Sequence, residues 1–150
     1  MTNNLNELLQ KKLHQDYATS TGVVMHSRMQ NIFFDSMGKA SDGNADIIKK
    51  ISKNPELVEY MGPNSKTEVP IAGYINGRFV SRRIDRLYVN LSKKIVVVLD
   101  YKTDIDKVCF RDKYTEQLRE YRSLLMDIYP YFNITCKILW LNDFTLETVI

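Results

Sequence analysis

Cysteine is scarce in this chain of 150 residues, which has two, and long apolar runs are lacking. Cys109 and Cys136 lie far apart and form no C-x-x-C pair. This spacing argues against a zinc site or an iron–sulfur cluster and favours reduced, structural thiols. No apolar run approaches the roughly 18 residues that a membrane span requires. The first residues also lack the basic region and apolar core of a signal peptide, so we expect no membrane partner and a cytoplasmic location.

A strong excess of charge is also lacking, because the net charge of +3 is too small to indicate a nucleic-acid partner. The basic residues nevertheless gather in one stretch, at Arg78, Arg82, Arg83, Arg86, Lys93 and Lys94. A solvated hairpin surface and a nucleic-acid contact both explain this cluster. The apolar share of 44% and the charged share of 26% are ordinary for a globular protein. The length fits one domain over residues 1–150, with 1–20 as a peripheral helix.

Helical periodicity dominates the first part of the chain. Apolar stripes predict four helices, at Leu5 to about Tyr17, Met25–Phe33, Ala45–Lys53 and Pro55–Tyr60. The run Thr19–Gly22 is predicted to separate the first two helices, because it contains capping residues and a glycine. The segment Gly38–Gly43 is expected to be a polar loop.

Alternation with period two then predicts strands at Thr67–Ile75, Arg78–Val89, Ile95–Tyr101, Ile134–Leu141 and Phe144–Ile150. Asn76-Gly77 is typical of a two-residue hairpin turn. A long helix is expected from about Phe110 to Tyr129, where Pro130 stops it. The strand–helix–strand order predicts a parallel, right-handed crossover. The predicted fold class is therefore α/β, with a mixed sheet, N-terminal helices, a three-strand meander, a crossover helix and closing strands.

One predicted strand ends in residues that packing alone does not explain. The apolar run Ile95–Leu99 is followed by Asp100, Tyr101 and Lys102, and the first and last of these point to the same face. Asp85, on the preceding strand, would supply a second carboxylate. Mg²⁺ prefers carboxylate and carbonyl oxygens, and the Tyr101 backbone carbonyl is a further candidate ligand. Lys102 would stabilise charge on a phosphate or hold an attacking water, so the set predicts a metal-dependent site for phosphodiester hydrolysis.

These residues, in this order, resemble the PD-(D/E)XK nuclease superfamily. The segment Gln117-Leu-Arg-Glu-Tyr121 is similar to the Q-x-x-x-Y motif of RecB-type nucleases. Further phrases resemble the C-terminal nuclease domain of alphaproteobacterial AddA helicase–nucleases, namely Gly62–Pro70, Ile84-Asp-Arg86, Asp100-Tyr-Lys-Thr103, Tyr121–Leu125 and Ile128-Tyr-Pro130. The resemblance spans about Gly22 to Leu141.

The resemblance implies a restriction-endonuclease-like fold and a deoxyribonuclease of the exonuclease type that depends on Mg²⁺ or Mn²⁺. Its substrate would be DNA, as single strands unwound at double-strand breaks, and its partners a helicase motor and an AddB-like subunit. The implied metal ligands are His26, Asp85, Asp100 and the Tyr101 carbonyl. The implied catalytic residues are Asp85, Asp100, Lys102, Gln117 and Tyr121. Glu68 matches an additional acidic position, and the DNA-binding candidates are Arg82, Arg83 and Arg86.

Each residue also has a plain structural explanation. A lone histidine at the edge of an apolar stripe, such as His26, is usually a satisfied core residue. Gln117 and Tyr121 share one helix face, where the first could be a surface residue and the second half-buried. The family often has glycine near Ser81, and no phosphate-binding P-loop occurs, so ATP hydrolysis by that route is not expected. The rival hypothesis is a catalytically inactive nuclease-fold module that binds DNA or docks a partner. A structure-specific endonuclease of the same superfamily would differ only in substrate.

Overall fold

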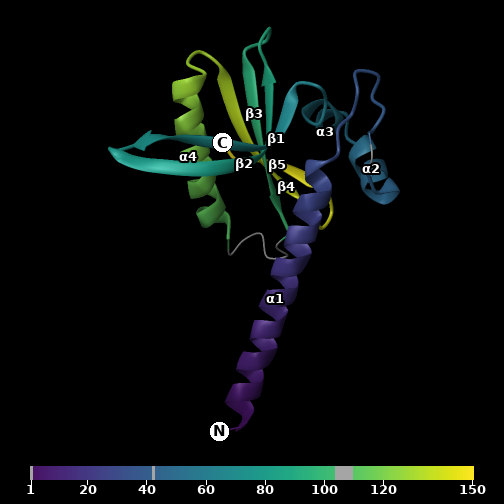
Figure 1. The fold of residues 1–150 in the computed structure, drawn as a ribbon, viewed down its shortest axis with the longest axis vertical. Coiled ribbons are helices and arrows are strands. Elements are labelled where there is room, and N and C mark those ends of the chain that lie inside the picture. Colours follow the sequence, from purple (N-terminus) through teal and green to yellow (C-terminus); the bar gives the residue numbers. More distant parts are fainter. Residues whose placement is uncertain (1, 42, 104–109) are drawn as a thin grey trace.

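The computed structural model describes residues 2–41, 43–103 and 110–150. Its elements are α1 (Thr2–Gln30), α2 (Ala45–Ser52), α3 (Pro55–Tyr60), β1 (Ser65–Ile75), β2 (Arg78–Asn90), β3 (Ile95–Lys102), α4 (Arg111–Ile128), β4 (Asn133–Trp140) and β5 (Thr145–Thr148). Figure 1 shows α4 on one side of the sheet, the shorter helices on the other, and α1 projecting away from the body. Among the described residues, no helix is both long and apolar enough to cross a membrane.

The strands form one mixed sheet in the order β1-β2-β3-β4-β5. The first three strands form an antiparallel meander, β3 and β4 are parallel, and β5 pairs antiparallel with β4. Asn76 and Gly77 have φ values of 50° and 76°, the left-handed conformation that a tight hairpin turn with positive φ at both central residues requires. The predicted α/β class, meander, crossover helix and closing strands are therefore confirmed.

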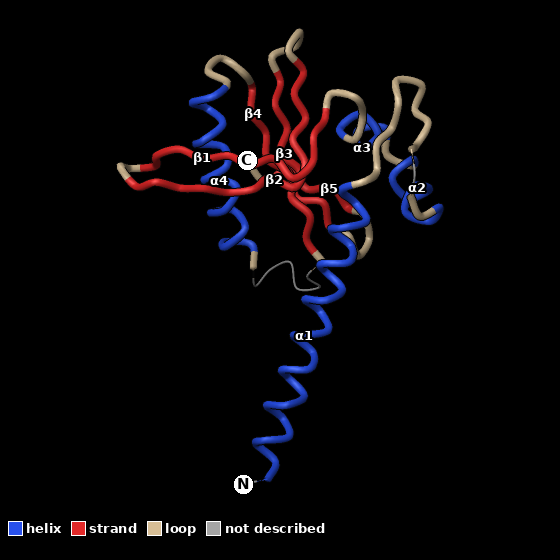
Figure 2. The backbone as a smooth tube through the Cα atoms, in the orientation of Figure 1, coloured by secondary structure: helices blue, strands red, loops and turns tan. Residues whose placement is uncertain are grey.

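The sheet bends at one row of the β1–β2 hairpin. Glu68 has a φ of 52°, and the pairing of the two strands skips the row that it shares with Asp85. Beyond this row the hairpin runs across α4 as an arm (Figure 2). On the arm, Gly73 lies so near α4 that a Cβ atom there would come within 2.9 Å of Leu124. Any larger residue at position 73 would have to displace the end of the Leu124 side chain.

Buried side chains form two hydrophobic clusters, one on each face of the sheet. The cluster under α4 includes Leu118 and Trp140, and the cluster under α1, α2 and α3 includes Met29 and Leu57. Strand β3 contributes alternate residues to the two clusters and is buried from Val96 to Tyr101. The end of this strand, with its charged residues, is consequently placed between the two clusters.

Helix α1 is continuous, so the break predicted at Thr19–Gly22 is wrong. The low helix propensity of these residues costs less than about 1 kcal/mol each, and the structure overrides it. The helix ends at Gln30, and Phe33, predicted on its apolar stripe, follows the helix instead. The Phe33 ring lies 4.7 Å from the guanidinium carbon of Arg86.

The other predicted helices are confirmed within one or two residues at each end. Asn44 accepts hydrogen bonds from the first backbone N–H groups of α2, and Asn54 does the same for α3, which has Pro55 in its first turn. Cys136 is buried as a free thiol, in agreement with the structural role expected for it. Cys109 lies outside the described residues.

Candidate active site

Three carboxylates share one row across β1, β2 and β3. The register on either side of Glu68 places it opposite Asp85, and the last pair of the β2–β3 ladder, Arg86 with Leu99, places Asp85 beside Asp100. Like charges opposite one another on neighbouring strands destabilise a sheet. Residues that break a local rule in this way are expected mainly at functional sites.

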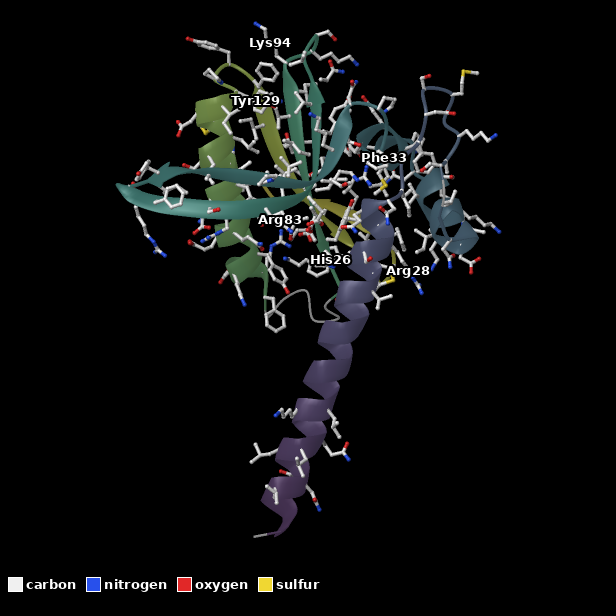
Figure 3. All side chains as sticks on the ribbon, in the orientation of Figure 1. His26, Arg28, Phe33, Arg83, Lys94 and Tyr129 are labelled. Carbon is white, nitrogen blue, oxygen red and sulfur yellow. The ribbon has the colours of Figure 1, made fainter. Side chains whose placement is uncertain are left out.

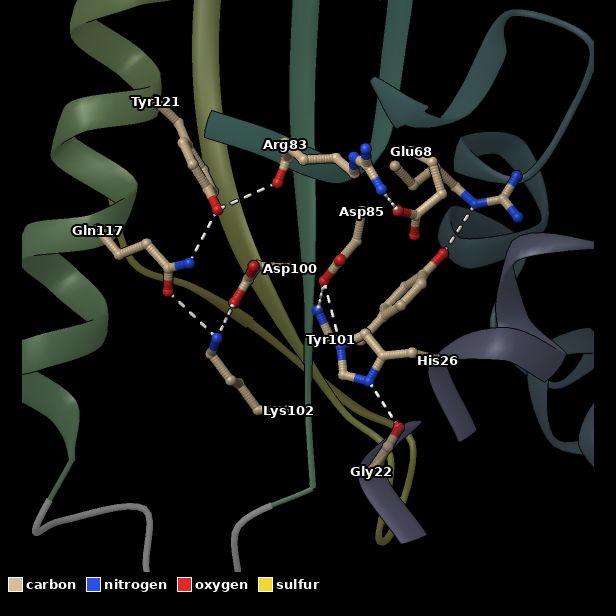
Figure 4. Close-up of polar contacts among 11 residues, drawn as sticks. Gly22, His26, Glu68, Arg83, Asp85, Asp100, Tyr101, Lys102, Gln117 and Tyr121 are labelled. Atoms are coloured by element: carbon tan, nitrogen blue, oxygen red, sulfur yellow. Dashed lines mark hydrogen bonds and ion pairs between the residues drawn. The ribbon is translucent and has the colours of Figure 1, made fainter. Parts of the chain in front are cut away.

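The backbone pairing of β2 and β3 ends at this row, where a side-chain carboxylate on β2 takes the place of a backbone carbonyl as the acceptor for an N–H group of β3. The Tyr101 backbone N–H donates a hydrogen bond of 2.7 Å to Asp85 Oδ2 (Figure 4). In an antiparallel ladder the N–H and C=O of one residue point to the same neighbour. The Tyr101 carbonyl, a predicted metal ligand, therefore faces the same edge as the Asp85 carboxylate.

Helix α1 brings His26 to this carboxylate. The Nδ1 atom lies 2.9 Å from the Gly22 carbonyl, which can only accept, so Nδ1 carries the hydrogen. Figure 3 shows His26 on the part of α1 that lies against the body of the domain. Its Nε2 atom is directed at Asp85 Oδ2, at 3.4 Å (Figure 4). The helix comes close to the end of β3 at Gly22, where a Cβ atom would lie 3.3 Å from Thr103 Oγ1.

The hydrogen bond with Asp85 raises the pKa of His26 from 6.5 to about 9, although partial burial opposes the rise. A histidine with a raised pKa stabilises the folded state when it is protonated. This stabilisation is complete below pH 6.5 and is lost as the pH rises through about 9.

We expect the Asp85→Asn variant to show a His26 pKa near the ordinary value, measured by NMR titration without divalent metal. An unchanged His26 pKa in that variant would contradict the pairing.

Asp100 is the most buried of the three carboxylates, with its side chain 4% exposed. The Lys102 Nζ atom forms an ion pair with Asp100 Oδ2 at 2.7 Å. Burial raises the pKa of Asp100, and the nearby Asp85 charge raises it further, whereas Lys102 lowers it. A buried carboxylate is costly unless cations neutralise it, and Lys102 does so here for Asp100.

Helix α4 orients the amine of Lys102 through a chain of hydrogen bonds. Lys102 Nζ donates to Gln117 Oε1 at 3.1 Å, and Gln117 Nε2 donates to the Tyr121 hydroxyl at 2.8 Å. The hydroxyl in turn donates to the Arg83 backbone carbonyl at 3.3 Å (Figure 4). The structure therefore brings Gln117 and Tyr121 into contact with the predicted lysine, as their shared helix face suggested.

An open cleft of about 440 Å³ lies on the α4 side of Lys102. Its lining residues are Arg82, Lys102, Lys113, Tyr114, Glu116, Gln117 and Glu120. Arg82 Nε bonds to Glu120 at 2.8 Å, whereas the Arg83 side chain is 70% exposed and lies 3.6 Å from Glu68. Of the three predicted DNA-binding arginines, Arg83 is thus the most accessible.

Arg86 does not reach the surface, so the prediction that it contacts DNA is wrong. The residue is fully buried. Its guanidinium donates hydrogen bonds to the Tyr101 and Ser65 hydroxyls and to the backbone carbonyls of Met29 and Ile32. Arg86 therefore joins the end of α1 to β1 and β3. The sequence carried one signal of this burial. Arg86 is two residues from Tyr88, so the two side chains lie on the same face of the strand, the face that packs in the core.

The donor set suits a hard divalent cation. Within the described ranges no three His, Cys, Asp or Glu side chains form a ready-made metal group. The two central carboxylates are instead neutralised by His26 and Lys102. The Asp85 carboxylate, the Asp100 carboxylate and the Tyr101 carbonyl are oxygen donors of the kind that Mg²⁺ and Mn²⁺ take, and such ions keep waters at their remaining positions.

No protein-family model matches the chain, and neither does any curated protein.

Proposed function

We propose that this chain is a metal-dependent deoxyribonuclease that hydrolyses phosphodiester bonds. The observation that carries the proposal is the row of carboxylates at the point where β2 and β3 separate, with Lys102 held beside a buried Asp100 oxygen. The restriction-endonuclease-like fold and the exonuclease type of activity belong to the same proposal, since both rest on the resemblance of the sequence motifs. The α/β sheet and the crossover helix are compatible with them.

Mg²⁺ or Mn²⁺, when bound, would activate a water and neutralise charge on the phosphate. Asp85, Asp100 and the Tyr101 carbonyl would hold it. Lys102, whose amine lies within the site, would position the attacking water or stabilise the developing negative charge. Gln117 and Tyr121 are positioning residues, because they act on Lys102 through hydrogen bonds.

His26 would join the metal ligands after losing one proton. Its Nδ1–H bond to Gly22 fixes the ring, which leaves the Nε2 lone pair directed at the Asp85 side of the site. Because the metal-free pKa of His26 is about 9, metal binding and proton release are coupled at neutral pH. Glu68 lies farther out and is paired with Arg83, so we assign it to the entrance of the site.

The proposed substrate is a DNA strand, with the exposed Arg83 facing its phosphates. Delivery of this strand by a helicase motor and an AddB-like subunit is part of the proposal that rests on the sequence resemblance alone. Action in double-strand break repair has the same basis.

The direct test is an assay of single-stranded DNA cleavage with Mg²⁺ or Mn²⁺ on the Lys102→Met variant. We expect a loss of about 100- to 1000-fold, the effect of removing one preorganised charge-stabilising group. The matched control is Lys113→Met, which removes another lysine of the same cleft and should leave cleavage nearly unchanged. Chelation of divalent metal should abolish cleavage.

Equal cleavage by the Lys102→Met variant and the wild type would remove Lys102 from the mechanism. If the chain binds DNA tightly without metal and cleaves none with Mg²⁺ or Mn²⁺, the nuclease proposal is excluded and the rival hypothesis of a catalytically inactive binding module is supported.

A further inference from the structure

Two aromatic side chains are exposed near the tip of the β1–β2 arm. Tyr74 and Phe79 are direct partners in the ladder, with ring centroids 5.7 Å apart in an edge-on arrangement. They are 69% and 59% exposed. An aromatic ring gains free energy when it leaves water, so an exposed pair indicates a surface that binds something.

The exposure of the pair follows from the alternation of the arm. Ile71 and Val80 belong to the cluster under α4, and Gly73 lies against Leu124 of that helix. Because successive strand residues point to opposite faces, Tyr74 and Phe79 must point away from α4. The hairpin pairing therefore fixes the two rings on the outer face of the arm.

The same outer face leads from the rings to the row of carboxylates. The pairs along it, in order, are Tyr74 with Phe79, Ala72 with Ser81, and Pro70 with Arg83, followed by the row of Glu68 and Asp85. At a rise of about 3.3 Å per residue, the path along the strand is about 20 Å long. It consists of an aromatic end, small side chains in the middle and the exposed Arg83 next to the site.

We propose that the outer face of the arm binds an unpaired DNA strand, with bases stacked on Tyr74 and Phe79 and the backbone passing Arg83 toward the carboxylates. This inference rests on the proposed nuclease function and names the surface by which a single strand would reach the site. Aromatic rings combined with cationic side chains are the pattern by which proteins hold unpaired bases and their phosphates. Duplex bases are already stacked and paired, so they cannot use the rings in this way.

Charge favours this occupant over an apolar protein surface. Arg83 is exposed, lies on the same outer face as the two rings, and stands at the end of the path that is nearest the carboxylates. A cation in line with two exposed rings matches a polyanion that carries flat bases.

The test is the binding of a labelled oligothymidylate of about twelve nucleotides, measured by fluorescence anisotropy without divalent metal. The Tyr74→Ser/Phe79→Ser double variant should bind at least about 5-fold more weakly for each ring that stacks on a base. The matched control is Tyr131→Ser, because Tyr131 is a 92% exposed aromatic outside the arm. The exchanged pair Tyr74→Phe/Phe79→Tyr keeps both rings and should bind like the wild type.

Strandedness gives a second readout. Duplex bases are not free to stack on the rings, so the double variant and the wild type should bind blunt duplex equally. Unaltered oligothymidylate binding by a double variant with wild-type circular dichroism would overturn the inference, and so would an equal loss for duplex. If the wild type cleaves DNA but the rings play no part in binding, the inference about the arm fails and the nuclease proposal stands. If binding depends on the rings but no cleavage occurs, the nuclease proposal fails and the arm still binds a single strand.

Discussion

The Asp100→Asn variant is expected to lose metal-dependent DNA cleavage by at least about 1000-fold, because a bound metal supplies several kcal/mol of charge stabilisation and 1.36 kcal/mol is a factor of ten in rate. Asn keeps the size of the side chain but removes the negative charge that would hold the cation. The measurement is the initial rate of single-strand cleavage at saturating Mg²⁺ and again at saturating Mn²⁺.

The same variant is expected to be at least as stable as the wild type at neutral pH. Burial raises the pKa of Asp100, so the ionised carboxylate is less favourable in the folded chain than in the unfolded chain. For an acid with a raised pKa, ionisation lowers the free energy of unfolding as the pH rises, and Asn removes this penalty. Activity and stability should therefore change in opposite directions.

The control is Asp127→Asn, which neutralises an exposed carboxylate of α4. It should alter neither quantity. A cleavage rate for Asp100→Asn within a few-fold of the wild type would exclude Asp100 as a metal ligand. A large loss of stability together with activity would instead identify Asp100 as a structural residue.

The Arg86→Met variant is expected to lose about 3 kcal/mol or more of unfolding free energy, since removal of the donor leaves several buried acceptors unsatisfied at about 1–3 kcal/mol each. Among these is the carbonyl of Ile32, just beyond the end of α1, whereas the Met29 carbonyl keeps the hydrogen bond from the Ile32 N–H. Domains of this size are typically stable by only about 5–15 kcal/mol. The measurement is denaturant unfolding followed by far-ultraviolet circular dichroism.

The matched control for Arg86→Met is Arg83→Met, in the same strand. The Arg83 side chain is 70% exposed, so its replacement should change stability by less than about 0.5 kcal/mol. Arg83→Met should instead weaken the binding of single-stranded DNA. If the two variants were equally stable, the buried network around Arg86 would not hold α1 to the sheet.

Local patterns predicted the parts of the fold that depend on neighbouring residues. The period-two runs and Asn76-Gly77 predicted the hairpin, and the helix between two apolar strands predicted the parallel pairing of β3 with β4. Alternation alone also predicted that Asp100 and Lys102 lie on one face, and they form an ion pair.

Long-range contacts were not predictable from such patterns. Thr19–Gly22 has a poor local preference for helix, yet α1 runs through it, and Gly22 lies close to Thr103, which is distant in sequence. Arg86 looked like another residue of a basic cluster, because its acceptors on Met29 and Ile32 are distant in sequence. The side chain of Tyr101, considered only for its carbonyl, proved to be one of the groups that hold Arg86.

The two faces of the sheet each supply one counter-ion to the row of carboxylates. His26 reaches Asp85 from the side of α1, and Lys102 reaches Asp100 on the side of α4. The two hydrophobic clusters are otherwise separated by the strands. A ligand that binds only the folded row adds its binding free energy to the stability of the chain. A cation bound at the row of carboxylates would therefore couple the unfolding of one hydrophobic cluster to that of the other. The candidate active site would then also make the unfolding of the domain more cooperative.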